Sequence, residues 1–490
     1  MSFINCAIPN CIYQALVERG RCGLCCRQYC FYHLNDPVHH CCILRKTNKW
    51  PGISLLKMKE PEISQLLSLL DEKVIVSEIE TYIPDHKVTK VHIKSTEDTI
   101  VELRGGFDLL IKIDLEDVGG QSQSWFMRIR KRSSGRPYPD EVLRMNLESE
   151  VATCQALFEG GVDVPQTFPR PGDSKQHPKL IYCYQSFIPG DAWPPFDPVT
   201  KFNDPPNPPV DYLTLNHIKS VAKWFIQLEK VQFDKIGSPS FDTSGKIMVG
   251  PLVEGEPTKA IPPYFDGPFT SLKERYLNVI DSKLRLLRNR ELVGPDSEIY
   301  SYLVLLELRE IVENVKELEK KKGPFYVRHA DDHSDHCRAT EDGEVMGVID
   351  WEWAYTTSKE EAFSSPDTLL PRVLSRTDDD HILTHREEAL IQAYESLNRP
   401  DLAECVREGR KYSRLMRCLH HAWASIHDIR AMRKGFKVDL VAGEAYPTEE
   451  SKEDWVERMK LKYADDEGLK WVLDNPVFEP ELPEECLEVK

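Results

Sequence analysis

Residues Tyr326–Ala339 read YVRHADDHSDHCRA, and this stretch decides the fold that we expect for the chain. Three histidines and three aspartates fall within the eight residues 329–336. Such side chains bind metal ions and move protons, so the pattern is typical of a catalytic or metal-binding loop. A solvated acidic loop beside a buried strand would read the same way. The neighbouring segments have to decide between these possibilities.

The segment ATEDGEVMGVIDWEWAY, residues 339–355, predicts a β-hairpin that follows this loop. Asp342-Gly343 lies between two strand-like runs and suits a two-residue turn, because glycine tolerates the positive φ that such turns need. Cross-strand partners then have numbers that sum to 685, which places Asp335 opposite Asp350 and His336 opposite Ile349. Opposed residues lie about 5 Å apart. The hairpin therefore brings two acidic sites together, an arrangement that suits a Mg²⁺–nucleotide complex.

At this point the sequence resembles the aminoglycoside-phosphotransferase family, especially its fungal members. The family's H-x-D-x-x-x-x-N loop matches His329, Asp331 and, in the asparagine position, His336, and its I-D-W element matches residues 349–351. The resemblance implies a two-lobed protein-kinase-like fold that uses ATP and Mg²⁺. It also implies Asp331 as the catalytic base and Asp350, with His336, as the Mg²⁺ ligands.

Other phrases of the family follow in the correct order, from about residue 75 to 370. TIVELRGGFDLLIKIDLEDVGGQSQSWFMRIRKR, residues 99–132, alternates apolar and polar residues around glycine-rich turns, which predicts antiparallel hairpins. EVLRMNLESEVATCQALFEGG, residues 141–161, predicts a helix that ends at Gly160-Gly161. The resemblance implies that the nucleotide is contacted by Gly105, Gly106 and Arg128, with Glu150 steadying the arginine.

Three departures from the family keep a second reading open. His336 replaces the asparagine, Arg128 replaces the phosphate-pairing lysine, and the glycine loop retains only one glycine pair. Imidazole prefers softer metals than Mg²⁺, and arginine does not have the shape of lysine. The alternative is a catalytically weak or dead kinase-like protein that binds a nucleotide or a protein partner.

A third reading makes the opening stretch the loop of a binuclear metallo-hydrolase. His333, Asp335 and His336 would then be zinc ligands that activate a water molecule, with Asp331 in place of a further histidine. Downstream histidines that could complete such a site are sparse: His381, His385 and the group at residues 420–427.

The first 42 residues hold eight of the 14 cysteines, which favours metal ligation because no secretion signal precedes them. Their spacing resembles the AN-one-type zinc finger. Its interleaved pairing implies one zinc site at Cys6, Cys11, Cys30 and His33, and a second at Cys22, Cys25, His39 and Cys41. Cys26, His40 and Cys42 are neighbours that could replace single ligands. Fingers of this type usually bind a protein partner.

The bulk composition sets further limits. A net charge of −17 argues against nucleic-acid binding by the whole chain, and no run of 18 apolar residues predicts a membrane span. We therefore expect a cytoplasmic, or else nuclear, protein.

We expect an α+β fold with an antiparallel-sheet N-lobe, a helical C-lobe and a small N-terminal zinc-binding module. The expected domains are residues 1–45, a zinc finger; 46–74, a linker and short helix; 75–190, the N-lobe; 191–445, the C-lobe with a proline-rich insert; and 446–490, a C-terminal extension with an acidic tail. The expected activity is transfer of the ATP γ-phosphate to a hydroxyl of a small molecule.

Overall fold

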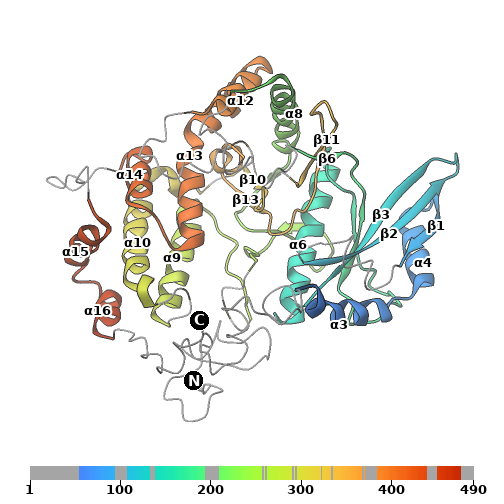
Figure 1. Cartoon of the computed structure of the whole chain (residues 1–490), viewed down its shortest axis with the longest axis horizontal. Coiled ribbons are helices and arrows are strands. Elements are labelled where there is room, and N and C mark those ends of the chain that lie inside the picture. Colours follow the sequence, from blue (N-terminus) through green and yellow to red (C-terminus); the bar gives the residue numbers. More distant parts are fainter. Residues whose placement is uncertain are drawn as a thin grey trace, which may run out of the picture. The chain divides into compact units, whose positions relative to one another are not determined.

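The computed structural model (Figure 1) describes residues 55–93, 107–132, 138–193, 209–255, 259, 262–289, 292, 295–321, 323–332, 335–366, 369, 383–438 and 450–475. The predicted zinc finger, the pair Gly105-Gly106, His333 and most of the proline-rich insert lie outside these residues. Contacts divide the chain into two compact units. The first comprises residues 1–272, 321–372 and 383–409, and the second comprises residues 273–320, 373–382 and 410–490.

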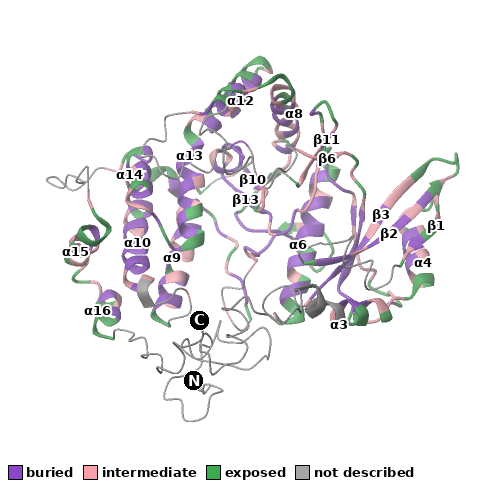
Figure 2. Ribbon diagram, in the orientation of Figure 1, coloured by how far each residue is buried: buried purple, intermediate pink, exposed green. Residues whose placement is uncertain are grey.

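The first unit contains a five-stranded antiparallel sheet, as the alternating sequence of residues 99–132 predicts for its centre. The strand order is β1-β2-β3-β5-β4. Along β2, alternate side chains are buried beneath one face, so its residues 109, 111, 113 and 115 all enter the core (Figure 2). The five strands are β1 (His86–His92), β2 (Asp108–Asp117), β3 (Ser122–Arg130), β4 (Thr167–Pro169) and β5 (Tyr182–Ser186).

Helices cover both faces of this sheet. α3 (Leu55–Ser68) and α4 (Glu72–Tyr82) pack their apolar side chains against the face formed by Ile111, Ile113 and Trp125. α6 (Asp140–Glu159) packs Leu147 and Val151 against Cys183 on the other face. The helix predicted to end at Gly160-Gly161 does end there, with Gly160 as its C-cap. The sheet therefore presents one of its faces, which carries Arg128, to α6.

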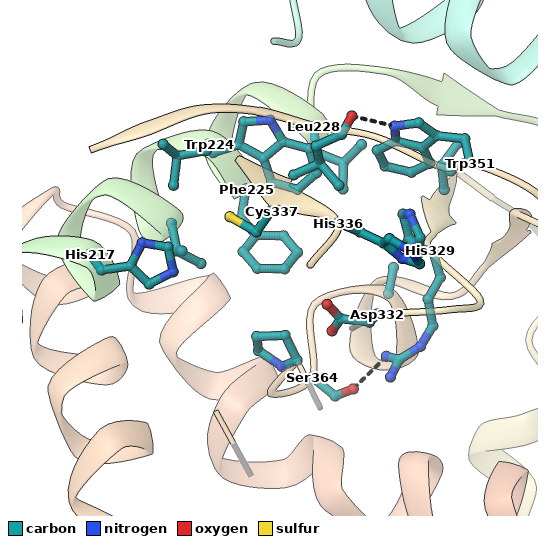
Figure 3. Close-up of a pocket in the computed structure, with 17 residues that line it drawn as sticks. His217, Trp224, Phe225, Leu228, His329, Asp332, His336, Cys337, Trp351 and Ser364 are labelled. Carbon is teal, nitrogen blue, oxygen red and sulfur yellow. Dashed lines mark hydrogen bonds between the residues drawn. The ribbon is translucent and has the colours of Figure 1, made fainter. Parts of the chain in front are cut away.

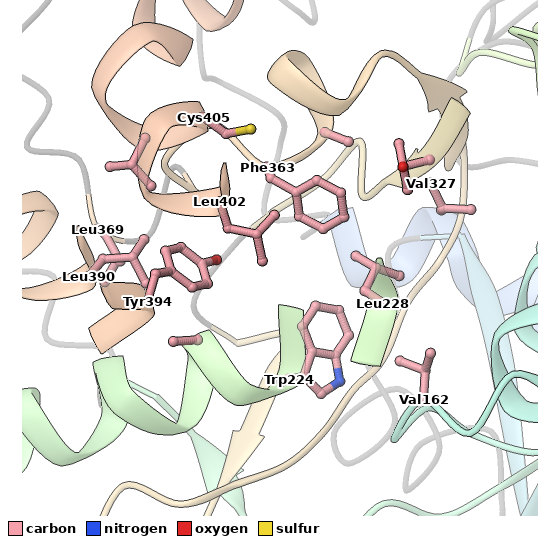
Figure 4. Close-up of a cluster of buried hydrophobic side chains, with 14 of the residues drawn as sticks. Val162, Trp224, Leu228, Val327, Phe363, Leu369, Leu390, Tyr394, Leu402 and Cys405 are labelled. Carbon is pink, nitrogen blue, oxygen red and sulfur yellow. The ribbon is translucent and has the colours of Figure 1, made fainter. Parts of the chain in front are cut away.

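The rest of the first unit combines helices with short strands around an apolar core. Trp224 and Leu228 of α8 (Tyr212–Leu228) belong to one buried cluster with Phe363, Tyr394 and Leu402 (Figure 4). Three small antiparallel sheets have the orders β13-β10-β7, β12-β11-β6 and β8-β9. The elements are β6 (Asp191–Ala192), β7 (Gln232–Phe233), β8 (Pro239–Phe241), β9 (Ile247–Val249), β10 (Phe325–Arg328), β11 (Cys337–Ala339), β12 (Val345–Val348), β13 (Tyr355–Thr357), α11 (Lys359–Ala362) and α12 (His385–Ser396).

The second unit is helical in its described part. Its helices are α9 (Leu272–Arg288), α10 (Pro295–Asn314), the 3₁₀ turn η1 (Lys316–Glu319), α14 (Ile426–Gly435), α15 (Lys452–Lys462) and α16 (Glu467–Asp474), and the division between the units falls within α13 (Pro400–His421). Buried Glu307 of α10 accepts hydrogen bonds from Arg433 of α14 at 2.7 Å and from Lys462 of α15 at 3.1 Å, so charged contacts join three helices of this unit. None of the helices in the described ranges is long and apolar enough to cross a membrane.

The predicted hairpin is present, but its turn differs from the prediction. The chain forms a three-residue loop, 341–343, closed by a hydrogen bond from the Thr340 N–H to the Glu344 carbonyl, with Gly343 at φ +82°. A bulge follows, because Arg338 pairs with Gly347 whereas Ala339 pairs with Val345. The extra loop residue and the bulge cancel, so Cys337 pairs with Val348 in the predicted register.

Candidate functional site

Arg128 is the centre of a buried group of charges. Its Nε and Nη2 atoms donate to Asp108 Oδ2 at 3.0 and 2.7 Å, and Nη1 donates to Glu150 and, at 3.1 Å, to Gln185. Nη2 also donates to Asp350 Oδ1 at 3.3 Å. These contacts use all five N–H groups of the guanidinium. One arginine thus joins the sheet, helix α6 and the segment after β12.

The group contains more acid than base. Arg130, two residues along β3, donates from Nη1 to Glu352 Oε1 at 2.5 Å and lies 3.4 Å from Asp108 Oδ1. Two guanidiniums therefore face four carboxylates. Burial raises the pKa of Glu150 to about 7 and that of Glu352 to about 8. Burial opposes the ionisation of Asp108 too, but the two arginines, Arg130 foremost, hold its pKa below the ordinary value. Of the four carboxyl groups, those of Glu150 and Glu352 thus retain a proton most readily.

Asp350 is held in a conformation that few aspartates adopt. Its φ is +63°, in the left-handed region, and a side chain there is uncommon outside functional sites and tight turns. The preceding residue is fixed because the Ile349 N–H donates to the His336 carbonyl at 2.9 Å. Oδ1 of Asp350 faces Arg128, and Oδ2 lies 3.4 Å from Nε2 of His336. The hairpin thereby places these two predicted site residues together.

Hydrogen bonds fix the ring nitrogens of His329 and His336 in the loop. Nε2 of His329 lies 3.0 Å from the Ile349 carbonyl oxygen, which can only accept, so this nitrogen carries the proton. Nδ1 of His329 accepts from the Asp331 N–H at 3.2 Å. Burial, aided by nearby His336, lowers the pKa of His329 to about 4, so its ring is neutral at physiological pH. Its role is to brace the loop around Asp331.

His336 is also oriented by a hydrogen bond to a backbone carbonyl. Its Nδ1 lies 2.7 Å from the Asp331 carbonyl oxygen and so carries the proton, which leaves Nε2 as the nitrogen that faces Asp350. In the neutral ring Nε2 is a lone-pair donor, which is the form that binds metal ions. Carboxylate oxygen and imidazole nitrogen 3.4 Å apart can share a cation or a proton. The two side chains thus place one oxygen and one nitrogen donor side by side.

A closed protein cage for a metal does not occur in the described ranges, where no group of three or more histidine, cysteine, aspartate or glutamate side chains is arranged to hold one. This bears on the hydrolase reading, which needs several such ligands in one place. Its His333 and His381 lie outside the described residues, and Asp335, with a side chain 65% exposed, is 4.0 Å from His336 Nε2.

A small cavity of about 50 Å³ lies behind the loop (Figure 3). His329, Asp332 and His336 line it from the loop, and Trp224 and Leu228 line it from α8. Figure 3 shows Asp332 and Ser364 on one side of this space and the aromatic rings of α8 on another.

Several neighbours of the site were not identified from the sequence. They are the charged residues Asp108, Arg130 and Glu352, and the polar residue Gln185. The alternation of side chains along a strand could have predicted them, because residues two apart on a strand share one face. Applied to RIR, residues 128–130, it places both arginines beside α6, and Glu352 then follows Asp350 at the same spacing.

No family model matches the chain, and no curated protein sequence is significantly similar to it. Some solved structures match most of the chain, at low TM-scores. A macrolide 2'-phosphotransferase type I has a TM-score of 0.35 at 14% identity, covering 78% of this chain and 97% of its own. The ethanolamine kinase of Plasmodium vivax has a TM-score of 0.37 at 13% identity, covering 85% and 96%. An amicoumacin kinase in complex with AMP-PNP and Ca²⁺ has a TM-score of 0.34 at 11% identity, covering 76% and 94%. TM-scores in this range are too low to assign a function, which we infer from the geometry of the site.

Proposed function

We propose that this protein is an ATP-dependent phosphotransferase that moves the γ-phosphate to a hydroxyl group of a small molecule. The observation that carries the proposal is the contact of Arg128 with both Glu150 and Asp350. A strand arginine, a helix carboxylate and a hairpin carboxylate, far apart in sequence, converge on one point. That point adjoins the loop of Asp331, as phosphoryl transfer by a protein-kinase-like fold requires.

Each residue has a role in this proposal. Asp350 and His336 would hold Mg²⁺, which neutralises charge on the phosphates when bound. Asp331, on a loop braced by His329, would orient the acceptor hydroxyl and take its proton. Gly105 and Gly106 would cover the phosphates. The main effects are positioning and charge stabilisation.

Arg128 can reach a phosphate only by exchanging a partner, because all five of its N–H groups are engaged. Its contact with Asp350 is the longest, at 3.3 Å, and the Asp350 side chain is 36% exposed, whereas Asp108 and Glu150 are buried. The contact with Asp350 is therefore the one to exchange. A cation that binds Asp350 would release one N–H group of Arg128 toward the nucleotide.

The domain layout expected from the sequence completes the proposal. Residues 1–45 would form a double zinc finger that binds a protein partner, residues 75–190 the N-lobe, and residues 191–445 the helical C-lobe. The protein would act in the cytoplasm or the nucleus.

A second candidate function is a nucleotide-binding module with little or no turnover. The engaged state of Arg128 favours it, because a guanidinium bound to three carboxylates must give up a partner before it can contact a phosphate. The zinc finger would then link this nucleotide-binding module to a protein partner.

The test is ATP binding and turnover by the full chain with Mg²⁺ or Mn²⁺, comparing wild type with Asp331→Asn and Asp350→Ala. We expect turnover in wild type and a loss of about 10²–10⁴-fold in Asp331→Asn. Asp342→Asn, at an exposed position of the hairpin loop, is the matched control and should retain turnover. Binding without turnover in wild type would favour the second candidate, and no binding would refute both.

A further inference from the structure

Arg130 is among the most deeply buried charged side chains of the first unit. It is 1% exposed, and Glu352, which it contacts at 2.5 Å, is 5% exposed. The Nε and Nη2 atoms of Arg130 are buried and have no hydrogen-bond partner. Burying a charge with part of its hydrogen bonding unmet is costly, and apolar replacement of a buried ion pair is often neutral or stabilising. A guanidinium at this position therefore calls for a role beyond packing.

The partner of Arg130 lies on the same short segment as Asp350. That segment is tightly turned: Asp350 and Trp353 both have left-handed φ values, +63° and +62°. Its backbone is tied at both ends, by the Trp351 indole to the Val348 carbonyl at 2.9 Å and by the Ala354 N–H to the Trp351 carbonyl at 3.2 Å. The side chains of residues 350 and 352 both point to β3.

The contacts form two parallel rungs. Arg128 contacts Asp350, and Arg130 contacts Glu352, so two guanidiniums two residues apart on β3 meet two carboxylates two residues apart on the segment. Residues at this spacing on a strand are about 7 Å apart. Asp108 lies between the rungs, within 3.0 Å of Arg128 and 3.4 Å of Arg130, and holds the guanidiniums at their spacing. One contact fixes a distance, whereas two such contacts also fix the orientation of the segment.

We propose that Arg130 is a positioning residue for metal binding, which anchors Glu352 and thereby holds the Asp350 carboxylate toward His336. Arg128 cannot do this alone, since its contact with Asp350 is the one that phosphate binding disrupts. The contact between Arg130 and Glu352 persists when the contact between Arg128 and Asp350 opens. The inference rests on the proposed function, because it explains the contact between Arg130 and Glu352 by the cation that Asp350 would bind.

The test compares wild type with the double variant Arg130→Met/Glu352→Met. Single substitutions remove one partner from a buried charged group and endanger folding, whereas apolar replacement of both partners of an ion pair is often tolerated. The readout is the Mn²⁺ concentration that half-saturates metal-dependent AMP-PNP binding, measured together with the thermal unfolding midpoint. We expect a cooperative unfolding transition, with a lowered midpoint because buried Asp108 loses one of its two arginines, and a rise of roughly ten-fold or more in the half-saturating Mn²⁺ concentration.

Two further variants sharpen the result. Arg132→Met/Asp140→Asn removes an exposed ion pair that follows the same strand, with contacts of 2.8 Å, and should leave the Mn²⁺ dependence unchanged. Arg130→Lys keeps one charge and should give an intermediate rise, which provides a test if the double variant fails to fold. A folded double variant with the wild-type Mn²⁺ dependence would overturn the inference alone. Absence of Mn²⁺-dependent AMP-PNP binding in wild type would overturn the proposed function and this inference with it.

Discussion

Replacing Glu150 by glutamine should stabilise the protein above neutral pH, although Glu150 contacts an arginine. The side chain is fully buried, one of its oxygens has no hydrogen-bond partner, and Arg128 already has Asp108 and Asp350 as partners. Burial raises the pKa of Glu150 from 4.5 to about 7. A glutamine has the same shape as the protonated acid and keeps an oxygen for Arg128.

The magnitude follows from proton linkage. A carboxyl whose pKa is raised on folding contributes its full stabilisation below pH 4.5, and this is lost as the pH rises through about 7. At about 1.4 kcal/mol for each pH unit, the titration of Glu150 lowers the free energy of unfolding of wild type by about 3 kcal/mol across this interval. The glutamine variant escapes this loss. It should match wild type near pH 5 and exceed it by up to about 3 kcal/mol near pH 8.

Urea denaturation followed by tryptophan fluorescence is a suitable assay, because Trp125 and Trp351 are fully buried in the first unit. Glu159→Gln, at the exposed end of the same helix, is the control for the change in net charge. If Glu150 is instead ionised as the required partner of Arg128, the variant should lose about 3–5 kcal/mol near pH 8. A destabilised variant at high pH would therefore refute the reasoning, because the two accounts predict opposite signs.

Three other outcomes are expected. Gly190→Ala should lower the free energy of unfolding by about 1–3 kcal/mol in urea denaturation, because φ is +101° and the new Cβ would lie 2.6 Å from the Ala339 carbonyl oxygen; unchanged stability would contradict this. Glu307→Ala should destabilise the second unit by about 3–5 kcal/mol, seen as faster hydrogen exchange in α10, because buried Arg433 loses a partner. Protein purified without chelators should contain two zinc ions per chain by elemental analysis, bound within residues 1–45, and a zinc-free preparation would contradict the double finger.

The hairpin shows how far local patterns can predict this fold. The register that brings His336 to Asp350 follows from a turn signal and a count of residues, and it is confirmed at the end of the hairpin near the site. The turn itself is longer than predicted, and a bulge corrects the difference. Turn length and bulges depend on tertiary contacts of the loop, such as the bond between His217 and the Gly343 carbonyl at 3.1 Å, which a local pattern does not contain.

The charge cluster shows what motif matching leaves out. Matching to a family motif assigns one residue to each role, so it selects Arg128, Glu150 and Asp350. It does not select the neighbouring pair of Arg130 and Glu352. Arg130 and Glu352 are recognisable only when the residues of one strand face are considered together with their charges. The need to balance four carboxylates is a property of the packed interior, where burial decides which of them ionise.

The small sheet β12-β11-β6 has a mechanical consequence for the first unit. β6 pairs with β11, and the Trp193 N–H donates to the Cys337 carbonyl at 3.1 Å, so the chain is fastened to the hairpin of β11 and β12 a few residues after it leaves β5. The Val348 N–H also donates to the Asp163 carbonyl at 3.1 Å, so the hairpin is tied to the chain on both sides of β4 and β5. These two ties limit how far the hairpin and the five-stranded sheet, and with them Asp350 and Arg128, can move apart.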